Sequence, residues 1–143
     1  MPLQRHHDWH VRLNRMLESA RELDFEWGKF DCAMHLGNCT RCMTVGEVDV
    51  AAAHRGKYSD EAGAIAIFGT DLGSFAATIA ASFGMQEVPP TMARRGDAVH
   101  ADNGTEYGCL GVVAMDGRFA SCVSTKGHVH VPMHRWKRAW RVG

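Results

Sequence analysis

The pattern of apolar residues changes at Pro89-Pro90, and this change constrains the fold more than any other feature of the chain. Before it, apolar residues recur at helical spacing, for example over residues 7–22. After it, short β-type runs alternate with turn residues, among them the hairpin signal Asp116-Gly117. Helices followed by an antiparallel meander predict an α+β domain.

Turn and capping residues set the expected limits of the elements. Helices are predicted over residues 7–22, 32–43, 59–69 and 71–83, with at most one further helical turn between 46 and 54. Strands are predicted over residues 96–101, 109–115, 118–124, 128–132 and 139–142. We expect one domain over residues 1–143, with a helical half over about 7–84 and a β half over about 87–142.

Charge and composition exclude several classes of partner. Sixteen basic and sixteen acidic residues cancel, so no nucleic-acid partner is expected. No apolar run approaches the length of a membrane span, and Met1–His10 contains no apolar signal-peptide core, so synthesis in the cytoplasm is expected. Five cysteines at irregular spacing do not form the pattern of a disulfide framework.

One cysteine stands where a nucleophile would be placed. Asp31 is a good N-cap residue, which puts Cys32 in the first turn of the following helix. The positive end of the helix dipole favours a thiolate there and is expected to lower the pKa of Cys32. A cysteine nucleophile also needs a general base within hydrogen-bond reach.

Three segments in this order resemble the NlpC-type cell-wall peptidases, a papain-like family. The matching segments are Trp27-Gly28 to Asp31-Cys32-Ala33, Arg95-Gly96-Asp97-Ala98-Val99, and Cys109 to Val113 followed by Asp116 to Phe119. The resemblance implies a papain-like fold in which helices pack on a C-terminal antiparallel sheet. It covers roughly residues 7–142.

The chain is more similar still to uncharacterised proteins encoded among the tail-tip genes of tailed phages. The shared elements are Trp27-Gly28 to Asp31-Cys32-Ala33, Arg55-Gly56-Lys57-Tyr58, Arg94 to Asp97, and Ala139 to Val142. This resemblance implies a component of the phage tail tip, made in the host cytoplasm, whose partners are other tail-tip proteins such as the hub.

The chain departs from the active peptidases at two positions. The resemblance places the catalytic histidine where this chain has Cys109, and the residue that orients it where this chain has Ser121. We therefore expect Cys32 and Cys109 to lie across from one another. Among the other histidines, His100 is the candidate for a substitute base, ahead of His128 and His130.

Two functions follow from the resemblance and remain open. The first is a structural tail-tip or tail-assembly protein with a degenerate peptidase site at Cys32. The second is an active cysteine peptidase or amidase that cleaves peptide bonds of peptidoglycan during phage entry. Neither function requires a cofactor.

Three further patterns each have a structural and a functional interpretation. Cys39-x-x-Cys42, on one helical stripe with residues 32 and 35, suits a metal site or core packing. His128-x-His130 suits two metal ligands or an alternating, half-exposed strand. The basic C-terminus, interleaved with Trp136 and Trp140, suits a protein interface, with Trp140 expected in the core.

Overall fold

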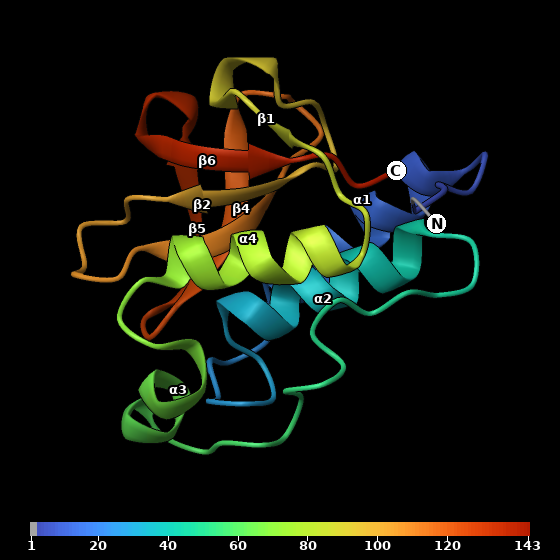
Figure 1. Cartoon of the computed structure of the whole chain (residues 1–143). Coiled ribbons are helices and arrows are strands. Elements are labelled where there is room, and N and C mark those ends of the chain that lie inside the picture. The colour runs from blue at the N-terminus through green and yellow to red at the C-terminus, as the bar shows by residue number, and fades with distance from the viewer. Residues whose placement is uncertain (1–2) are drawn as a thin grey trace.

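Four helices precede a six-stranded antiparallel sheet in the computed structural model, which describes residues 3–143 (Figure 1). The helices are α1 (Trp9–Ala20), α2 (Cys32–Met43), α3 (Glu61–Phe68) and α4 (Leu72–Ser82). The strands are β1 (Glu87–Val88), β2 (Ala98–Ala101), β3 (Cys109–Val113), β4 (Phe119–Ser124), β5 (Gly127–Pro132) and β6 (Trp136–Trp140). The predicted α+β class is confirmed. The expected domain also included residues 1 and 2, which lie outside the described residues.

Three aspartates fix the starts of three of the four predicted helices, α2, α3 and α4. The side chains of Asp31, Asp60 and Asp71 each accept a hydrogen bond from the backbone N–H three residues further along the chain. These bonds satisfy N–H groups that the first helical turn leaves without partners. The segment 46–54 forms turns rather than the additional helical turn considered there.

The sheet must curl, because of how its last two strands are connected. Its strand order is β1-β6-β2-β3-β4-β5, so three strands separate β5 from β6. In a flat sheet these two strands would lie about 19 Å apart. Only Met133–Arg135 connects them, a linker that spans about 14 Å at most when extended. The indole N–H of Trp136 donates to the Val131 carbonyl oxygen at 2.9 Å across the closed corner.

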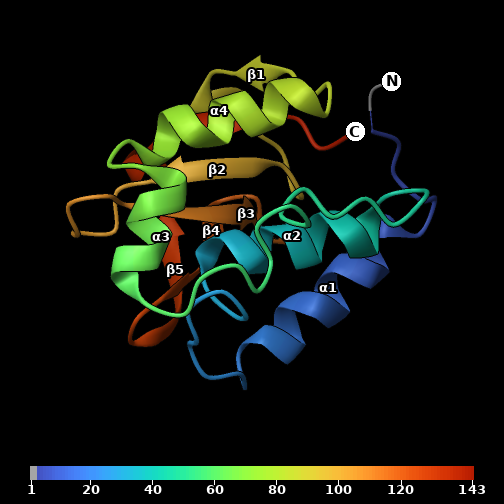
Figure 2. The ribbon, with the colours of Figure 1, turned by 60° about the horizontal axis from the view of Figure 1, so that its bottom comes forward.

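The curled sheet has a core on each of its faces. Leu110, Val112 and Trp140 point toward the helices and pack in the larger core. Cys109 and Val113 point the other way, into a smaller core enclosed by the curl of the sheet. Figure 2 shows α2 and α4 beside the sheet and α1 on the outer side of α2. Burial of both faces explains why β2 and β3 do not alternate between apolar and polar residues and carry only one polar side chain, that of His100.

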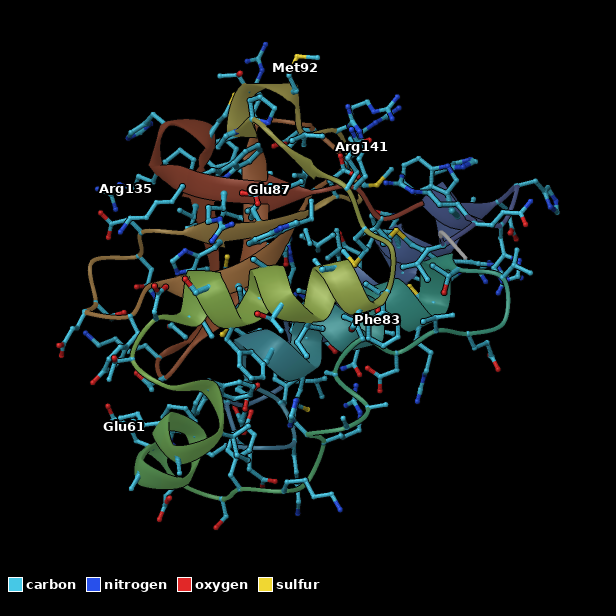
Figure 3. The ribbon with its side chains drawn as sticks, viewed as in Figure 1. Glu61, Phe83, Glu87, Met92, Arg135 and Arg141 are labelled. Atoms are coloured by element: carbon cyan, nitrogen blue, oxygen red, sulfur yellow. The ribbon has the colours of Figure 1, made fainter. Side chains whose placement is uncertain are left out.

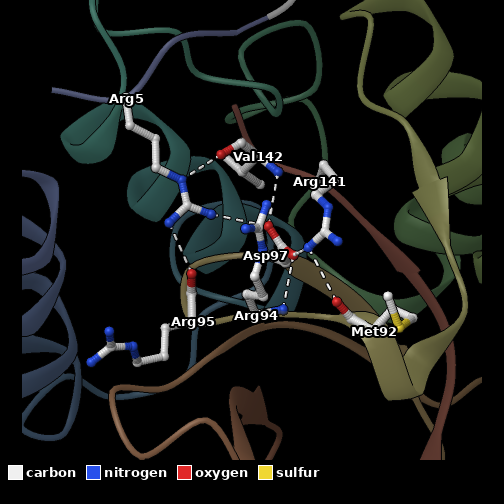
Figure 4. Close-up of polar contacts among 7 residues, drawn as sticks. All are labelled: Arg5, Met92, Arg94, Arg95, Asp97, Arg141 and Val142. Carbon is white, nitrogen blue, oxygen red and sulfur yellow. Dashed lines mark hydrogen bonds and ion pairs between the residues drawn. The ribbon is translucent and has the colours of Figure 1, made fainter.

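A buried carboxylate joins the two ends of the described chain (Figure 4). Asp97 is fully buried and accepts four hydrogen bonds. Two come from the guanidinium groups of Arg5 and Arg141, at 3.0 and 2.9 Å. The other two come from the backbone N–H groups of Arg94 and Val142, at 2.9 and 3.2 Å. Asp97 therefore holds the N-terminal segment, the β2 turn and the C-terminal segment together.

The basic C-terminal stretch is not the exposed aromatic surface considered from its composition. Trp136 and Trp140 are both buried, which confirms the expectation for Trp140 and corrects that for Trp136. Arg138 pairs with Glu87 at 2.7 Å. Figure 3 shows Arg135 and Arg141 at opposite ends of β6. Strand pairing brings this stretch into the sheet, so most of its apolar surface is already covered.

Among the described residues, no single helix is long and apolar enough to cross a membrane. Helices α3 and α4 meet the length and composition criteria only when they are taken together as a pair bent by 56°.

Candidate functional site

The start of α2 is held by a loop that only glycine can form. Gly28 has φ +78°, and a Cβ at this position would lie 2.0 Å from the Tyr58 carbonyl oxygen. The Gly28 carbonyl oxygen accepts the Gly56 N–H at 2.9 Å. The Trp-Gly-x-x-Asp-Cys and Arg-Gly-x-Tyr elements, separate in the sequence, therefore pack directly against each other.

Asp31 is the polar centre of this contact. Its carboxylate is buried and accepts the Met34 and Gly28 N–H groups, each at 2.9 Å. The Tyr58 hydroxyl donates a third hydrogen bond to the same carboxylate. Burial, followed by the bond to Asp31, raises the pKa of Tyr58. The sequence predicted Asp31 as a cap but gave no sign of its bond to Tyr58.

Cys32 is the first residue of α2, as predicted, but its thiol is not activated. The residue is half-buried, and burial raises the pKa of Cys32, as do the neighbouring Cys109 and Asp31. The backbone N–H groups of Leu110 and Ala33 act in the opposite direction without offsetting this effect. The expected lowering of the pKa by the helix dipole is thus wrong, because loss of solvation outweighs a dipole contribution of about 1 kcal/mol.

The structure brings the Cys109 position of β3 to the Cys32 site. Both cysteines line one cleft, and Cys32 packs against the smaller core that contains Cys109. A third cysteine, Cys122 on β4, lies in the same core, where interaction with the Cys109 thiol and then burial raise the pKa of Cys122. All three are free thiols.

The cleft at Cys32 has a volume of about 320 Å³, and five of its lining residues are aromatic. Its aromatic residues are Phe25, Trp27, Tyr58, Phe68 and Tyr107. Asp31 and Glu61 are its two acidic residues. No histidine lines the cleft in the part of the chain that the structure describes.

His100 contacts residues of the cleft wall but does not line the cleft itself, so its contacts do not support a role as substitute base. It pairs with Leu110 across the β2–β3 ladder, whereas Cys109 pairs with Ala101. Because paired residues share a face, the His100 side chain points toward the helices, away from the face of Cys109. Its Nε2 is 3.0 Å from the Tyr107 carbonyl oxygen, and its Nδ1 lies against Gly73 of α4.

Ser121, which the resemblance placed at the position of the orienting residue, belongs to a separate group of hydrogen-bonded polar side chains. Its buried hydroxyl is 3.0 Å from His35 Nε2 and 2.7 Å from His128 Nε2. The His128 and His130 rings are in edge contact, with centroids 4.7 Å apart. His128 therefore leans toward Ser121 and His35, while Ser121 does not line the cleft.

The pKa values of both imidazoles hydrogen-bonded to Ser121 are lowered. Burial, followed by electrostatic interaction with His128, lowers the pKa of His35 to about 4. Burial, then His130 and Arg21, lowers the pKa of His128. Within residues 3–143, the His35 Nδ1 atom is buried without a hydrogen-bond partner. The sequence had placed His35 only on the cysteine stripe of α2.

The Cys-x-x-Cys pattern lies within the packing of α2. Cys39 is fully buried in the larger core, and the half-buried Cys42 donates through its Sγ to the Cys39 carbonyl oxygen at 3.2 Å. Among residues 3–143, no three histidine, cysteine, aspartate or glutamate side chains are grouped so as to hold a metal ion.

Comparison with known proteins adds one match. Residues 4–142 match the model of a family described as a domain of unknown function, DUF6950. No curated protein matches the chain. Because the match covers nearly the whole of the curled sheet, its helices and the Cys32 cleft, the chain belongs to the DUF6950 family.

Proposed function

We propose that this chain is an NlpC-type, papain-like domain that has lost its general base and serves as a binding component of a phage tail tip. Its support comes from the order of the elements: a cysteine at a helix start, then a curled antiparallel sheet whose third strand begins beside that cysteine. The tail-tip role rests on the resemblance to phage proteins that share the Trp27 and Tyr58 elements. Its partners would be other tail-tip proteins such as the hub.

The single observation that carries the loss of activity is the residue facing Cys32. A Cys–His enzyme needs an imidazole about 3 Å from the sulfur, both to take the thiol proton and to protonate the leaving amine. Here Cys109 occupies the corresponding side of the cleft, and no histidine lines it among the described residues. A thiol whose pKa is raised by burial stays protonated at neutral pH and is a poor nucleophile.

One observation favours the alternative of an active peptidase or amidase. Cys32 lines an accessible cleft at the first turn of α2, where backbone N–H groups can stabilise an oxyanion. In that mechanism the Cys32 thiolate attacks a peptide carbonyl of peptidoglycan, an acyl-enzyme forms, and water releases it. In Cys–His enzymes an imidazole protonates the leaving amine, and among the described residues no histidine lines the cleft.

Release of soluble fragments from purified peptidoglycan separates the two functions. Under the proposal, the wild-type chain and Cys32→Ala both give background release. Cys109→His, which restores an imidazole facing Cys32, is the informative gain-of-function variant, and Cys122→His in the enclosed core is its control. Wild-type release that disappears in Cys32→Ala would establish the peptidase instead.

The tail-tip assignment has its own test. Virions produced from the genome that encodes this chain are purified and dissociated, and their tail fraction is analysed by mass spectrometry. The chain is expected in that fraction at a fixed ratio to the hub. Its absence from virions would refute the assignment whatever the hydrolysis assay gives.

A further inference from the structure

A second pocket lies beside the two ends of the described chain and shares no lining residue with the cleft of Cys32. It has a volume of about 620 Å³ and is open to solvent. Arg5 and Trp9 come from the N-terminal segment, and Arg94 and Arg95 come from the turn before β2. The remaining wall consists of Met115, Asp116, Gly117 and Gly143.

The floor of this pocket is rigid. The Arg5 guanidinium donates to the carbonyl oxygens of Val142 and Arg95, at 2.5 and 2.8 Å, and to the Asp97 carboxylate at 3.0 Å. It also lies over the Trp9 ring, 4.2 Å from the centroid. Gly96, at φ +84°, permits this approach, because a Cβ there would lie 2.7 Å from Arg5 Nη1. Because Arg5 donates to the Arg95 carbonyl oxygen and Asp97 accepts the Arg94 N–H, the backbone that carries the two exposed arginines is held in place.

The pocket carries positive charge that the described residues do not neutralise. The carboxylate of Asp97 is fully buried and committed to Arg5, Arg141 and two backbone N–H groups. Asp116 Oδ1 accepts two backbone N–H groups of its own hairpin. Arg94 and Arg95 are exposed, and neither forms an ion pair within residues 3–143.

The arginines also act on one another. Burial is the main cause that lowers the pKa of Arg5, and the charges of Arg94 and Arg141 lower it further, against the opposing effect of Asp97. Counted over side chains, the four guanidinium groups of Arg5, Arg94, Arg95 and Arg141 lie with two carboxylates, those of Asp97 and Asp116, an excess of two positive charges. An anion bound between Arg94 and Arg95 would relieve this repulsion.

We propose that this pocket docks an acidic segment of a partner protein, with Arg94 and Arg95 binding its carboxylates. Arginine matches a carboxylate with paired, charge-assisted hydrogen bonds. Trp9 and Met115 supply the apolar contacts that protein interfaces favour together with arginine. A zero net charge over the whole chain disfavours an extended polyanion such as nucleic acid. The inference rests on the proposed function in one respect, namely that the partner is a protein.

Calorimetric titration with a blocked hexaglutamate peptide at low ionic strength tests the proposal. The wild-type chain should bind one peptide, and affinity should fall as salt is added. Arg94→Gln with Arg95→Gln should weaken binding by roughly tenfold or more. The matched control is Arg135→Gln with Lys137→Gln, which removes two exposed charges at the far end of β6 (Figure 3) and should change affinity less than about twofold. Circular dichroism and thermal melting verify that each variant folds.

Three results would overturn the proposal. One is the absence of hexaglutamate binding. Another is equal weakening in the two double variants, which would mean a diffuse effect of net charge. The third is tighter binding of inorganic phosphate or hexathymidylate with the same dependence on Arg94 and Arg95, which would assign the pocket to phosphate. Neither the hydrolysis assay nor virion analysis depends on these arginines, so failure of docking is distinguishable from failure of the proposed function.

Discussion

Replacement of Asp97 by asparagine is expected to be among the most destabilising single changes to this domain. One carboxylate oxygen, Oδ1, accepts hydrogen bonds from Arg5 and from the Val142 N–H. The other oxygen, Oδ2, accepts hydrogen bonds from Arg141 and from the Arg94 N–H. Asparagine keeps one acceptor oxygen and places an NH₂ group at the other position. Whichever way the amide is turned, one guanidinium and one backbone N–H then face another donor.

The magnitude follows from the bonds that are lost. A hydrogen bond to a charged group contributes about 1.5–3 kcal/mol, and an unsatisfied buried N–H costs about 1–3 kcal/mol. Partial relaxation of the arginines toward solvent reduces the sum, so we expect a loss of about 3–5 kcal/mol, the range for breaking a buried ion pair. That is a large part of the roughly 5–15 kcal/mol that stabilises a typical domain.

Urea denaturation at pH 7, followed by tryptophan fluorescence, measures this loss. Asp116→Asn is the matched control, because Asp116 is exposed and asparagine can accept the same two hairpin N–H groups. The control should change the free energy of unfolding by less than about 0.5 kcal/mol. A loss below about 1 kcal/mol for Asp97→Asn, or an equal loss for both variants, would refute the reasoning.

Two further changes test the polar contacts around α2. The free energy of unfolding should fall as the pH drops from about 6.5 through 4, because the folded-state pKa of His35 is lowered to about 4 and the unfolded chain then binds more protons. Urea titrations near pH 4 should show a loss of about 3 kcal/mol relative to neutral pH. His35→Gln should flatten this pH dependence, whereas the control His134→Gln, at an exposed position, should not. A steep pH dependence that survives in His35→Gln would contradict the role of His35. Tyr58→Phe should cost about 1–2 kcal/mol, since the buried Asp31 loses one of its three donors. Tyr107→Phe, at a half-buried position, is its control, and equal losses would contradict a specific role for the Tyr58 hydroxyl.

The helix starts could be predicted because capping is local, whereas the limits of the strands could not, because they depend on pairing between distant segments. The three capping aspartates placed α2, α3 and α4 to within two residues, because a cap acts over one helical turn. The two-residue strand β1 gave no periodic signal and exists only because it pairs with β6. For the same reason β6 begins at Trp136, earlier than the predicted strand over residues 139–142.

In the candidate site, too, local features were predictable from the sequence and contacts between distant residues were not. The position of Cys32 followed from Asp31, and the resemblance brought Cys109 to it. The direction of the Cys32 pKa shift was wrong because the helix dipole is local whereas burial depends on β3 and the rest of the fold. The link between His35 and Ser121 joins residues 86 positions apart and depends on the register of β4, which no local pattern specifies.

The contacts of Asp31 also change what the Asp-Cys motif signifies. Gly28 is required by the close approach of Tyr58, and Asp31 by its three donors, so both residues are explained by packing without any reaction. A match to the Trp-Gly-x-x-Asp part of the motif is therefore evidence for the fold and carries little information about catalysis. The Cys32 side chain also lines the cleft, and its sulfur is the nucleophilic atom of the motif. The case for catalysis thus depends on the Cys32 sulfur and on the residue opposite it, and in this chain that residue is Cys109.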